Sequence, residues 1–199
     1  AIRHLEKVEG LNYSPAIKNY LAQHVELDKA VESLITKLEE SGNLDNTVIV
    51  ISSDHYPYGL TTEELNERSK IDRSDFYDRD KLPFIVWNNN IEPAEVTKLG
   101  SSLDIVPTLA NLFGLDYDSR LLMGRDLFSE SEPLVIFSNR SWMTEKGRYC
   151  ALTKSFVHTD EAEVNLEYIN RINRVVYNRF NMSRLILEKD YYRKVLFDE

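Results

Sequence analysis

A long amphipathic stretch followed by a short apolar one most constrains the fold of this chain. Ser14 and Pro15 form a helix start, because serine caps the first free N–H groups and proline is tolerated at the first helical position. Apolar residues then recur at helical spacing as far as Gly42, which can adopt the left-handed conformation that ends a helix. After a short turn at 43–46, residues 47–52 form a continuous β-branched run, which is typical of a strand covered on both faces. Helix, short turn and buried strand together predict the α/β fold class.

The rest of the chain continues this pattern with shorter elements. The polar stretch 59–80 indicates an exposed excursion that contains a helix at 62–69, capped by Thr61 or Thr62. The remaining predicted elements are a strand at 82–88, one or two helical turns at 93–99, a helix at 101–114, strands at 133–139 and 148–157, and a mostly helical tail at 161–197 with a break at 181–183. We therefore expect a central, mostly parallel or mixed sheet with helices on both faces and a helical C-terminal tail.

Composition excludes several classes of function. The net charge is −9 and no block of five or six consecutive Lys and Arg residues occurs, which argues against nucleic acid or an anionic membrane surface as the main partner. Cys150 is the single cysteine, so the chain forms no intrachain disulfide and no cysteine-based zinc site. No apolar run reaches the length of about 18 residues that crosses a bilayer. The chain opens on a charged stretch without Met, and we expect it to be part of a longer protein.

A carboxylate and an imidazole, Asp54 and His55, stand side by side where the strand ends. In a continuing strand neighbouring side chains point to opposite faces, so the two could not meet one ion. A turn supported by Pro57 and Gly59 lets both face a common point, at the strand edge where α/β proteins bind ligands. One carboxylate with one neutral imidazole suits Mn²⁺ or Zn²⁺. A hydrogen-bonded pair at a strand end is the alternative, and the spacing alone leaves both open.

Other candidate residues give weaker signals. His24 lies on the predicted helix one turn before Asp28, which favours a structural pair. The sequence contains no glycine-rich phosphate loop and no Gly-x-Ser-x-Gly nucleophile elbow. Arg140 and Trp142 follow a predicted strand and combine a cation with an aromatic ring, which suits either a polar substrate pocket or a surface turn.

Four segments resemble, in the right order, those of the sulfatase and alkaline phosphatase superfamily. They are residues 45–55, which run from Asp-Asn-Thr through a strand to Asp-His; residues 82–87; residues 102–114, with Asp-Ile-x-Pro-Thr-Leu; and residues 123–128, with Gly-x-Asp-Leu. Tyr56 directly after His55, and the Asn-Arg-Ser-Trp stretch at 139–142, are similar to the lipoteichoic acid synthase branch, whose members are phosphoglycerol transferases.

The resemblance implies a partial alkaline-phosphatase-like domain. Residues 1–145 would be the C-terminal part of the catalytic domain, and residues 146–199 a strand and helical extension packed on the same domain. A divalent ion would be held by Asp54 and His55, with manganese the first choice and magnesium, zinc or calcium as alternatives. Tyr56, Arg140 and Trp142 would lie near the substrate. The family's nucleophilic Thr, its first acidic ligand and its substrate-binding His precede the part matched here, so we expect no catalytic residue in this chain, weak metal binding and no turnover by the chain alone.

The resemblance also implies partners and a location. The parent would be a bacterial membrane protein, anchored by N-terminal helices, with its catalytic domain outside the cytoplasm. This segment would itself be soluble and would need the upstream half of its own catalytic domain. The substrate would be a phosphoglycerol lipid, or another phosphate or sulfate ester. A sulfate-ester hydrolase and a non-catalytic binding module with the same fold are the alternative functions.

Overall fold

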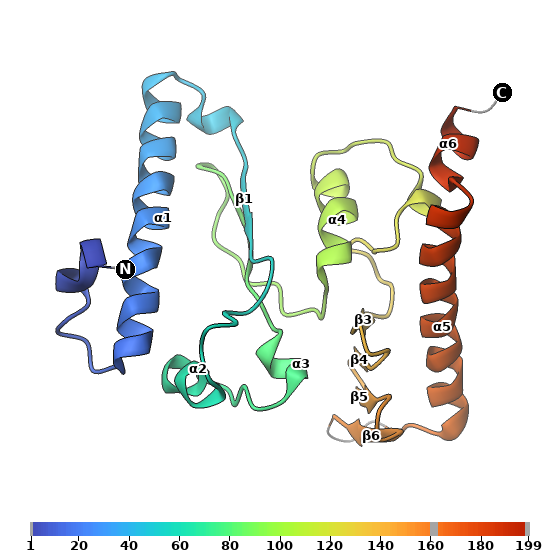
Figure 1. Ribbon diagram of the computed structural model, residues 1–199. Helices are drawn as coiled ribbons and strands as arrows, with labels where there is room; N and C mark the ends of the chain where they lie inside the picture. Colours follow the sequence, from blue (N-terminus) through green and yellow to red (C-terminus); the bar gives the residue numbers. More distant parts are fainter. Residues whose placement is uncertain (1, 160–162, 198–199) are drawn as a thin grey trace. The chain divides into compact units, whose positions relative to one another are not determined.

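The computed structural model describes residues 2–159 and 163–197, and the chain forms two compact units, residues 1–94 and 95–199. The first unit runs from blue to green in Figure 1. Its elements are the 3-10 helix η1 (Ile2–Lys7), α1 (Pro15–Glu40), the 3-10 helix η2 (Leu44–Asn46), β1 (Ile49–Ser52), α2 (Thr62–Arg68), α3 (Phe76–Arg79) and β2 (Phe84–Trp87). The predicted order of helix, turn, strand, short helix and strand is therefore confirmed for this unit.

Local capping chemistry sets the ends of the helices in the first unit. The Ser14 hydroxyl accepts a hydrogen bond from the Ile17 N–H at 3.4 Å, and Pro15 occupies the first helical position. Gly42 follows the helix with a φ of 71°, a left-handed conformation that costs glycine nothing. At α2, Thr61 and Glu64 form a reciprocal capping box. Both predicted helix starts are therefore confirmed at residue level.

The strands of the first unit pair differently from the expectation. β1 and β2 are antiparallel, with Ile49 opposite Trp87 and Ser52 opposite Phe84. The excursion between them contains only short helices, so the chain returns to the end of β1 that it left, and antiparallel pairing follows. The β-branched run is also not covered on both faces, because Val50 and Ile85 are 38% and 48% exposed. The α/β class is confirmed, but the described strands of both units pair antiparallel rather than parallel or mixed.

The second unit combines a four-stranded antiparallel sheet with a long helix. Its elements are the 3-10 helix η3 (Ser102–Asp104), α4 (Ile105–Leu112), the 3-10 helix η4 (Ser119–Leu121), β3 (Val135–Ile136), β4 (Trp142–Thr144), β5 (Gly147–Cys150), β6 (Ser155–His158), α5 (Leu166–Glu188) and α6 (Tyr191–Leu196). The sheet order is β3-β4-β5-β6, and α5 runs beside the sheet (Figure 1). The helical C-terminal tail is thereby confirmed, apart from its first residues 161 and 162, which lie outside the described part.

The core of the second unit forms between the sheet and α5. Trp142 is 0% exposed, and it packs with Ile172 and Val176 of α5, which are 4% and 2% exposed. The indole N–H donates a hydrogen bond to Asn173 Oδ1 at 2.8 Å, which satisfies the one polar atom of the ring. Partly buried apolar residues surround this cluster: Leu134, Ile136, Tyr149, Phe156, Tyr168, Ile169 and Phe180. Residues three and four apart on one face of α5 therefore meet residues of the strands in one small core.

Two segments that are distant in sequence interlock at the start of the second unit. The buried Asp104 carboxylate accepts hydrogen bonds from the Ser101 N–H and hydroxyl and from the Arg125 N–H, at 2.7, 3.0 and 2.7 Å. The Thr108 hydroxyl accepts one from the Leu127 N–H at 3.0 Å. Gly124 lies so close to the Leu103 carbonyl that a Cβ at this position would overlap it. Asp104, Thr108 and Gly124, which belong to the segments 102–114 and 123–128, therefore hold these two segments together in this fold.

Several predicted boundaries in the second unit are wrong. Residues 93–99 form no helix, and the run 148–157 is a hairpin of β5 and β6 rather than one strand. α5 continues through 181–183, and the helix breaks instead at Asp190, which has a left-handed φ of 50°. A turn at 145–146 joins β4 to β5 inside the second unit. The division of the catalytic domain at residue 145 stays a prediction about the family's organisation.

The hydroxyl group of Tyr168 links α5 to the sheet through hydrogen bonds. The Tyr168 hydroxyl donates to Glu132 Oε1 at 2.6 Å and lies 2.9 Å from Thr144 Oγ1. We expect Tyr168→Phe to lower the free energy of unfolding by about 1–2 kcal/mol, because the partners lose hydrogen bonds in a half-buried place. Denaturant unfolding measures this loss, with Tyr177→Phe as a control, since Tyr177 lies on the same helix and is 54% exposed.

The same tyrosine predicts how stability depends on pH. Burial, and then the hydrogen bond to Glu132, raise the pKa of Tyr168 from 10.0 to about 12. Because the pKa is higher in the folded state, its contribution is fully present below about pH 10 and is lost as pH rises through 12. The unfolding free energy of the wild type should therefore fall more steeply between pH 10 and 12 than that of Tyr168→Phe. Equal slopes for the two proteins would contradict this account.

Candidate metal-ligand pair

The chain turns directly after β1 and brings Asp54 and His55 together. Asp54 Oδ1 accepts a hydrogen bond from the His55 backbone N–H at 2.9 Å, which folds the carboxylate back over its neighbour. Asp54 Oδ2 then lies 3.4 Å from His55 Nε2. The side chains are 86% and 44% exposed, so both reach solvent. The two side chains therefore face a common point rather than opposite faces of the sheet.

One hydrogen bond fixes which ring nitrogen of His55 is available. Nδ1 lies 2.6 Å from the Tyr56 carbonyl oxygen, and because a carbonyl only accepts, Nδ1–H is the donor. In the neutral ring the lone pair is then on Nε2, which faces the Asp54 carboxylate. A lone pair and a carboxylate at this distance repel each other unless a proton or a cation lies between them. The carboxylate of Asp54 and the Nε2 lone pair of His55 are therefore two electron-pair donors that can share one proton or cation.

Aromatic rings and an arginine support this pair from the side. The Tyr58 ring stacks on the His55 ring, with centroids 4.0 Å apart and planes 7° from parallel. Tyr56 meets Tyr58 edge to face at 4.8 Å. The Arg79 guanidinium lies 4.5 Å above the Tyr56 ring, which joins α3 to the turn. These contacts restrain the orientation of the imidazole through its neighbours.

The pair fits as part of a divalent metal site by its donor chemistry. Two ligands of one ion, each about 2.1 Å from it, are separated by at most about 4.2 Å. The observed 3.4 Å lies within that limit. Stable sites use four or more ligands, whereas the described residues contain no cluster of three or more His, Cys, Asp or Glu side chains with metal-site geometry. Asp54 and His55 can thus supply only part of a coordination sphere.

The other candidate residues from the sequence belong to the second unit. Arg140 is exposed in the turn before β4 with a φ of 67°, and its guanidinium lies 5.4 Å from the Phe180 ring. Trp142 is fully buried in the core and has no exposed surface with which to contact a substrate. Its indole therefore serves packing in this structure.

Sequence reasoning missed the partners of the pair. Arg79 was part of a polar excursion without periodicity, Tyr58 stood just before it, and nothing in their spacing placed them against residues 55 and 56. The Tyr-Pro-Tyr pattern at 56–58 was the available signal, because proline favours a turn, and a turn can fold the residues on either side of it toward each other.

Comparison with a known structure agrees with this fold. A solved structure described as a protein in the alkaline phosphatase superfamily, from Vibrio parahaemolyticus, superposes with a TM-score of 0.53 over 81% of this chain and 40% of the other, at 17% sequence identity. At that identity the likeness concerns the fold. It is consistent with a partial α/β domain of the alkaline phosphatase type.

Sequence comparison defines the family. The family model Sulfatase matches residues 5–115, which is more than half of the chain and includes Asp54 and His55. The chain therefore belongs to the sulfatase family.

Two named relatives show the similarity in more detail. Lipoteichoic acid synthase 2 of Bacillus subtilis (strain 168) is 27% identical over 189 residues, covering 89% of this chain and 28% of that protein. Lipoteichoic acid synthase of Staphylococcus aureus (strain USA300) is 28% identical over 137 residues, covering 67% of this chain and 21% of that protein. The chain thus spans about a quarter of the length of these relatives. Among the described residues, no helix combines the length and the apolar character needed to span a membrane.

Proposed function

We propose that this chain is the C-terminal segment of the catalytic domain of a metal-dependent phosphoglycerol transferase or phosphodiesterase that acts outside the cytoplasm. In this proposal Asp54 and His55 are two of the ligands of a divalent ion, with manganese as the first choice. The observation that carries the proposal is the 3.4 Å approach of Asp54 Oδ2 to His55 Nε2, directly after β1 in a sulfatase-family chain. The similarity to lipoteichoic acid synthases supports the transferase branch.

Contacts within this chain orient Asp54 and His55 for binding a metal ion. The Tyr56 carbonyl holds the proton on Nδ1, so that Nε2 offers its lone pair. Tyr58 stacks on the imidazole, and the His55 N–H holds the Asp54 carboxylate against it. A divalent ion in such a site lowers the pKa of a hydroxyl nucleophile and neutralises charge on a phosphoryl group. Tyr56 and the exposed Arg140 are proposed to lie near the substrate.

The remaining ligands and the nucleophilic threonine are proposed to come from the upstream half of the same catalytic domain. The two-stranded sheet supports this, because among residues 2–159 and 163–197 β1 and β2 pair only with each other, and the sheet exposes Val50 and Ile85. N-terminal helices of the longer protein would anchor it to the membrane of a bacterium. The substrate would then be a phosphoglycerol lipid.

A sulfate-ester hydrolase is the second candidate, because the matching family model is Sulfatase. The identity of the nucleophilic residue discriminates between the hydrolase and the transferase. A cysteine or serine in a modification motif upstream of this chain would favour the hydrolase, and a threonine would favour the transferase. A non-catalytic module with the same fold would need neither, and would leave the longer protein without turnover.

The proposed metal role is tested by two substitutions in the longer protein. We expect Asp54→Asn and His55→Gln each to reduce turnover of a phosphodiester substrate by more than about a hundredfold. Substitution of a residue that only hydrogen-bonds to a metal ligand already lowers metal affinity or activity about 10- to 100-fold, and a ligand itself should matter more. Bound manganese, measured by elemental analysis, should fall in parallel. Asp28→Asn and His24→Gln are matched controls, since both residues are exposed on α1 and should leave activity and metal content unchanged.

The chain alone provides a complementary test. With two ligands it should bind Mn²⁺ and Zn²⁺ weakly, as measured by isothermal titration. Sub-micromolar affinity that disappears in Asp54→Ala would contradict the need for upstream ligands. Full activity of the longer protein with Asp54→Asn would contradict the metal role itself.

A further inference from the structure

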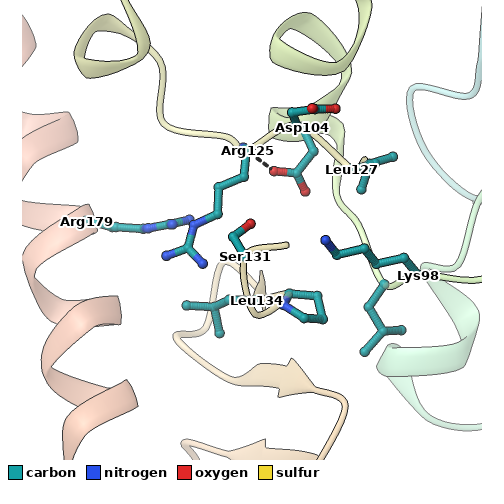
Figure 2. Close-up of a pocket in the computed structure, with 10 residues that line it drawn as sticks. Lys98, Asp104, Arg125, Leu127, Ser131, Leu134 and Arg179 are labelled. Carbon is teal, nitrogen blue, oxygen red and sulfur yellow. Dashed lines mark hydrogen bonds between the residues drawn. The ribbon is translucent and has the colours of Figure 1, made fainter. Parts of the chain in front are cut away.

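A small pocket in the second unit gathers positive side chains from three parts of the chain. Figure 2 shows Lys98, Arg125 and Arg179 pointing toward the same space, with Ser131 and Leu134 beside them. Lys98 precedes η3, Arg125 lies in the loop before β3, and Arg179 extends from α5. The full lining consists of Lys98, Leu99, Asp104, Arg125, Asp126, Leu127, Ser131, Pro133, Leu134 and Arg179. The pocket lies within the second unit and shares no residue with the Asp54–His55 pair.

The two carboxylates in the lining are already occupied by other donors. Asp104 accepts from Ser101 and from the Arg125 N–H, as described above. Asp126 accepts from Asn111 Nδ2 and from the Phe128 N–H, both at 2.9 Å. Their charges offset part of the positive charge, but their oxygen atoms are engaged. Three cations against two carboxylates leave the lining with a net positive charge.

The cations keep free donors. Arg125 Nη1 donates to the Glu132 carbonyl at 2.7 Å, and Lys98 Nζ donates to the Ser129 carbonyl. A guanidinium has five N–H donors and an ammonium has three, so most of them remain available. Backbone carbonyls orient these side chains without neutralising them. The donors are therefore held in place for a further acceptor.

Arg179 is the most informative of the three. It is half-buried, and its guanidinium has no hydrogen-bond or ion-pair partner within the ranges 2–159 and 163–197. Burial, followed by the positive charge of Arg125, lowers the pKa of Arg179, while Asp104 raises it. The side chain nevertheless stays charged at neutral pH, because the ordinary pKa of arginine lies far above neutral. A half-buried cation that faces a second cation is stabilised by an anion between them.

We propose that this pocket binds a small oxyanion, namely a phosphate group. Arg179 and Arg125 would each donate N–H groups to it, and Lys98 would add a third charge from the opposite side (Figure 2). The pocket is small, which suits a compact oxyanion such as inorganic phosphate or the terminal phosphate of a monoester. This site is independent of the metal proposal, since it needs no divalent ion and lies in the other unit.

Titration in metal-free buffer at constant ionic strength tests the proposal. Inorganic phosphate, glycerol 3-phosphate and chloride are added separately to the isotopically labelled 199-residue chain, and backbone amide shifts are followed by NMR. We expect saturable shifts at Leu127 and Ser131 with phosphate and none with chloride. Tighter binding of glycerol 3-phosphate than of phosphate would identify an ester as the source, and equal or weaker binding would identify the free ion.

Substitutions on α5 provide the decisive comparison. Arg179→Gln should weaken phosphate binding about tenfold or more, as expected for the loss of a hydrogen bond between charged groups. Arg174→Gln removes an exposed charge from the same helix and should change affinity less than about twofold. If Arg179→Gln fails to fold, Lys98→Gln takes its place with the same expected loss. Linear shifts that chloride reproduces, or equal affinity in Arg179→Gln and Arg174→Gln, would overturn the proposal.

Discussion

Replacement of Gly124 by alanine should lower the free energy of unfolding by about 4 kcal/mol, near the upper end for single substitutions. A Cβ at this position would overlap the carbonyl oxygen of Leu103 and stand 2.8 Å from the backbone nitrogen of Asp104. These are backbone atoms, so no side-chain rotation relieves the overlap. The loop 123–128 would have to move away, and the bonds from the Arg125 and Leu127 N–H groups to Asp104 and Thr108 would be lost with it.

Denaturant unfolding followed by circular dichroism measures this effect. Gly10→Ala and Gly59→Ala are suitable controls, because a Cβ at either position has no heavy atom within 4 Å. Each control should stay within about 1 kcal/mol of the wild type. Wild-type stability in Gly124→Ala would mean that the two segments do not approach each other as described.

Replacement of Trp142 by alanine should cost about 3–5 kcal/mol, the range for large aromatic residues in a core. The ring is 0% exposed and is the largest side chain of the cluster between the sheet and α5. Its removal leaves a cavity beside Ile172 and Val176, and it also leaves Asn173 Oδ1 without its 2.8 Å donor. The expected result is a second unit in which α5 is no longer held on β4.

The same unfolding measurement distinguishes a core role from a surface role. Tyr177→Ala removes an aromatic ring from α5 at a position that is 54% exposed, and it should cost less than about 1 kcal/mol. A loss in Trp142→Ala no larger than in Tyr177→Ala would contradict the packing described here. It would return Trp142 to the list of residues available to a substrate.

Local chemistry made the helix ends of this chain predictable. Ser14, Pro15 and Gly42 act through contacts within one helical turn, so their residue types alone define where α1 begins and ends. The break in the C-terminal helix was not predictable in this way. Asp190 adopts a left-handed φ there, whereas residues 181–183 continue the helix.

Strand pairing depends on distant partners and was predicted less well. The β-branched run at 47–52 favoured a strand with both faces covered, but coverage comes from other segments, and within this chain Val50 and Ile85 remain exposed. The hairpin between β5 and β6 places a turn inside a run whose composition favours one strand. Neither the exposure of the β1–β2 sheet nor the turn between β5 and β6 is indicated by the residue types nearby in the sequence.

The approach of Asp54 to His55 was predictable because the two residues are adjacent and follow a strand. Its supporting contacts were not, since Arg79 reaches Tyr56 from a helix more than twenty residues away. The three cations of the phosphate pocket come from positions 98, 125 and 179, and only the tertiary fold brings them together. Sequence motifs thus located the adjacent pair, and the structure located both the contacts around that pair and the separate cluster of cations.

The position of bound manganese in the longer protein tests the central claim most directly. Crystals grown with Mn²⁺ and measured at its absorption edge would show the ion as an anomalous difference peak. The account predicts one peak about 2.2 Å from an Asp54 carboxylate oxygen and from His55 Nε2. An occupied manganese site in the catalytic domain that touches neither side chain would contradict it.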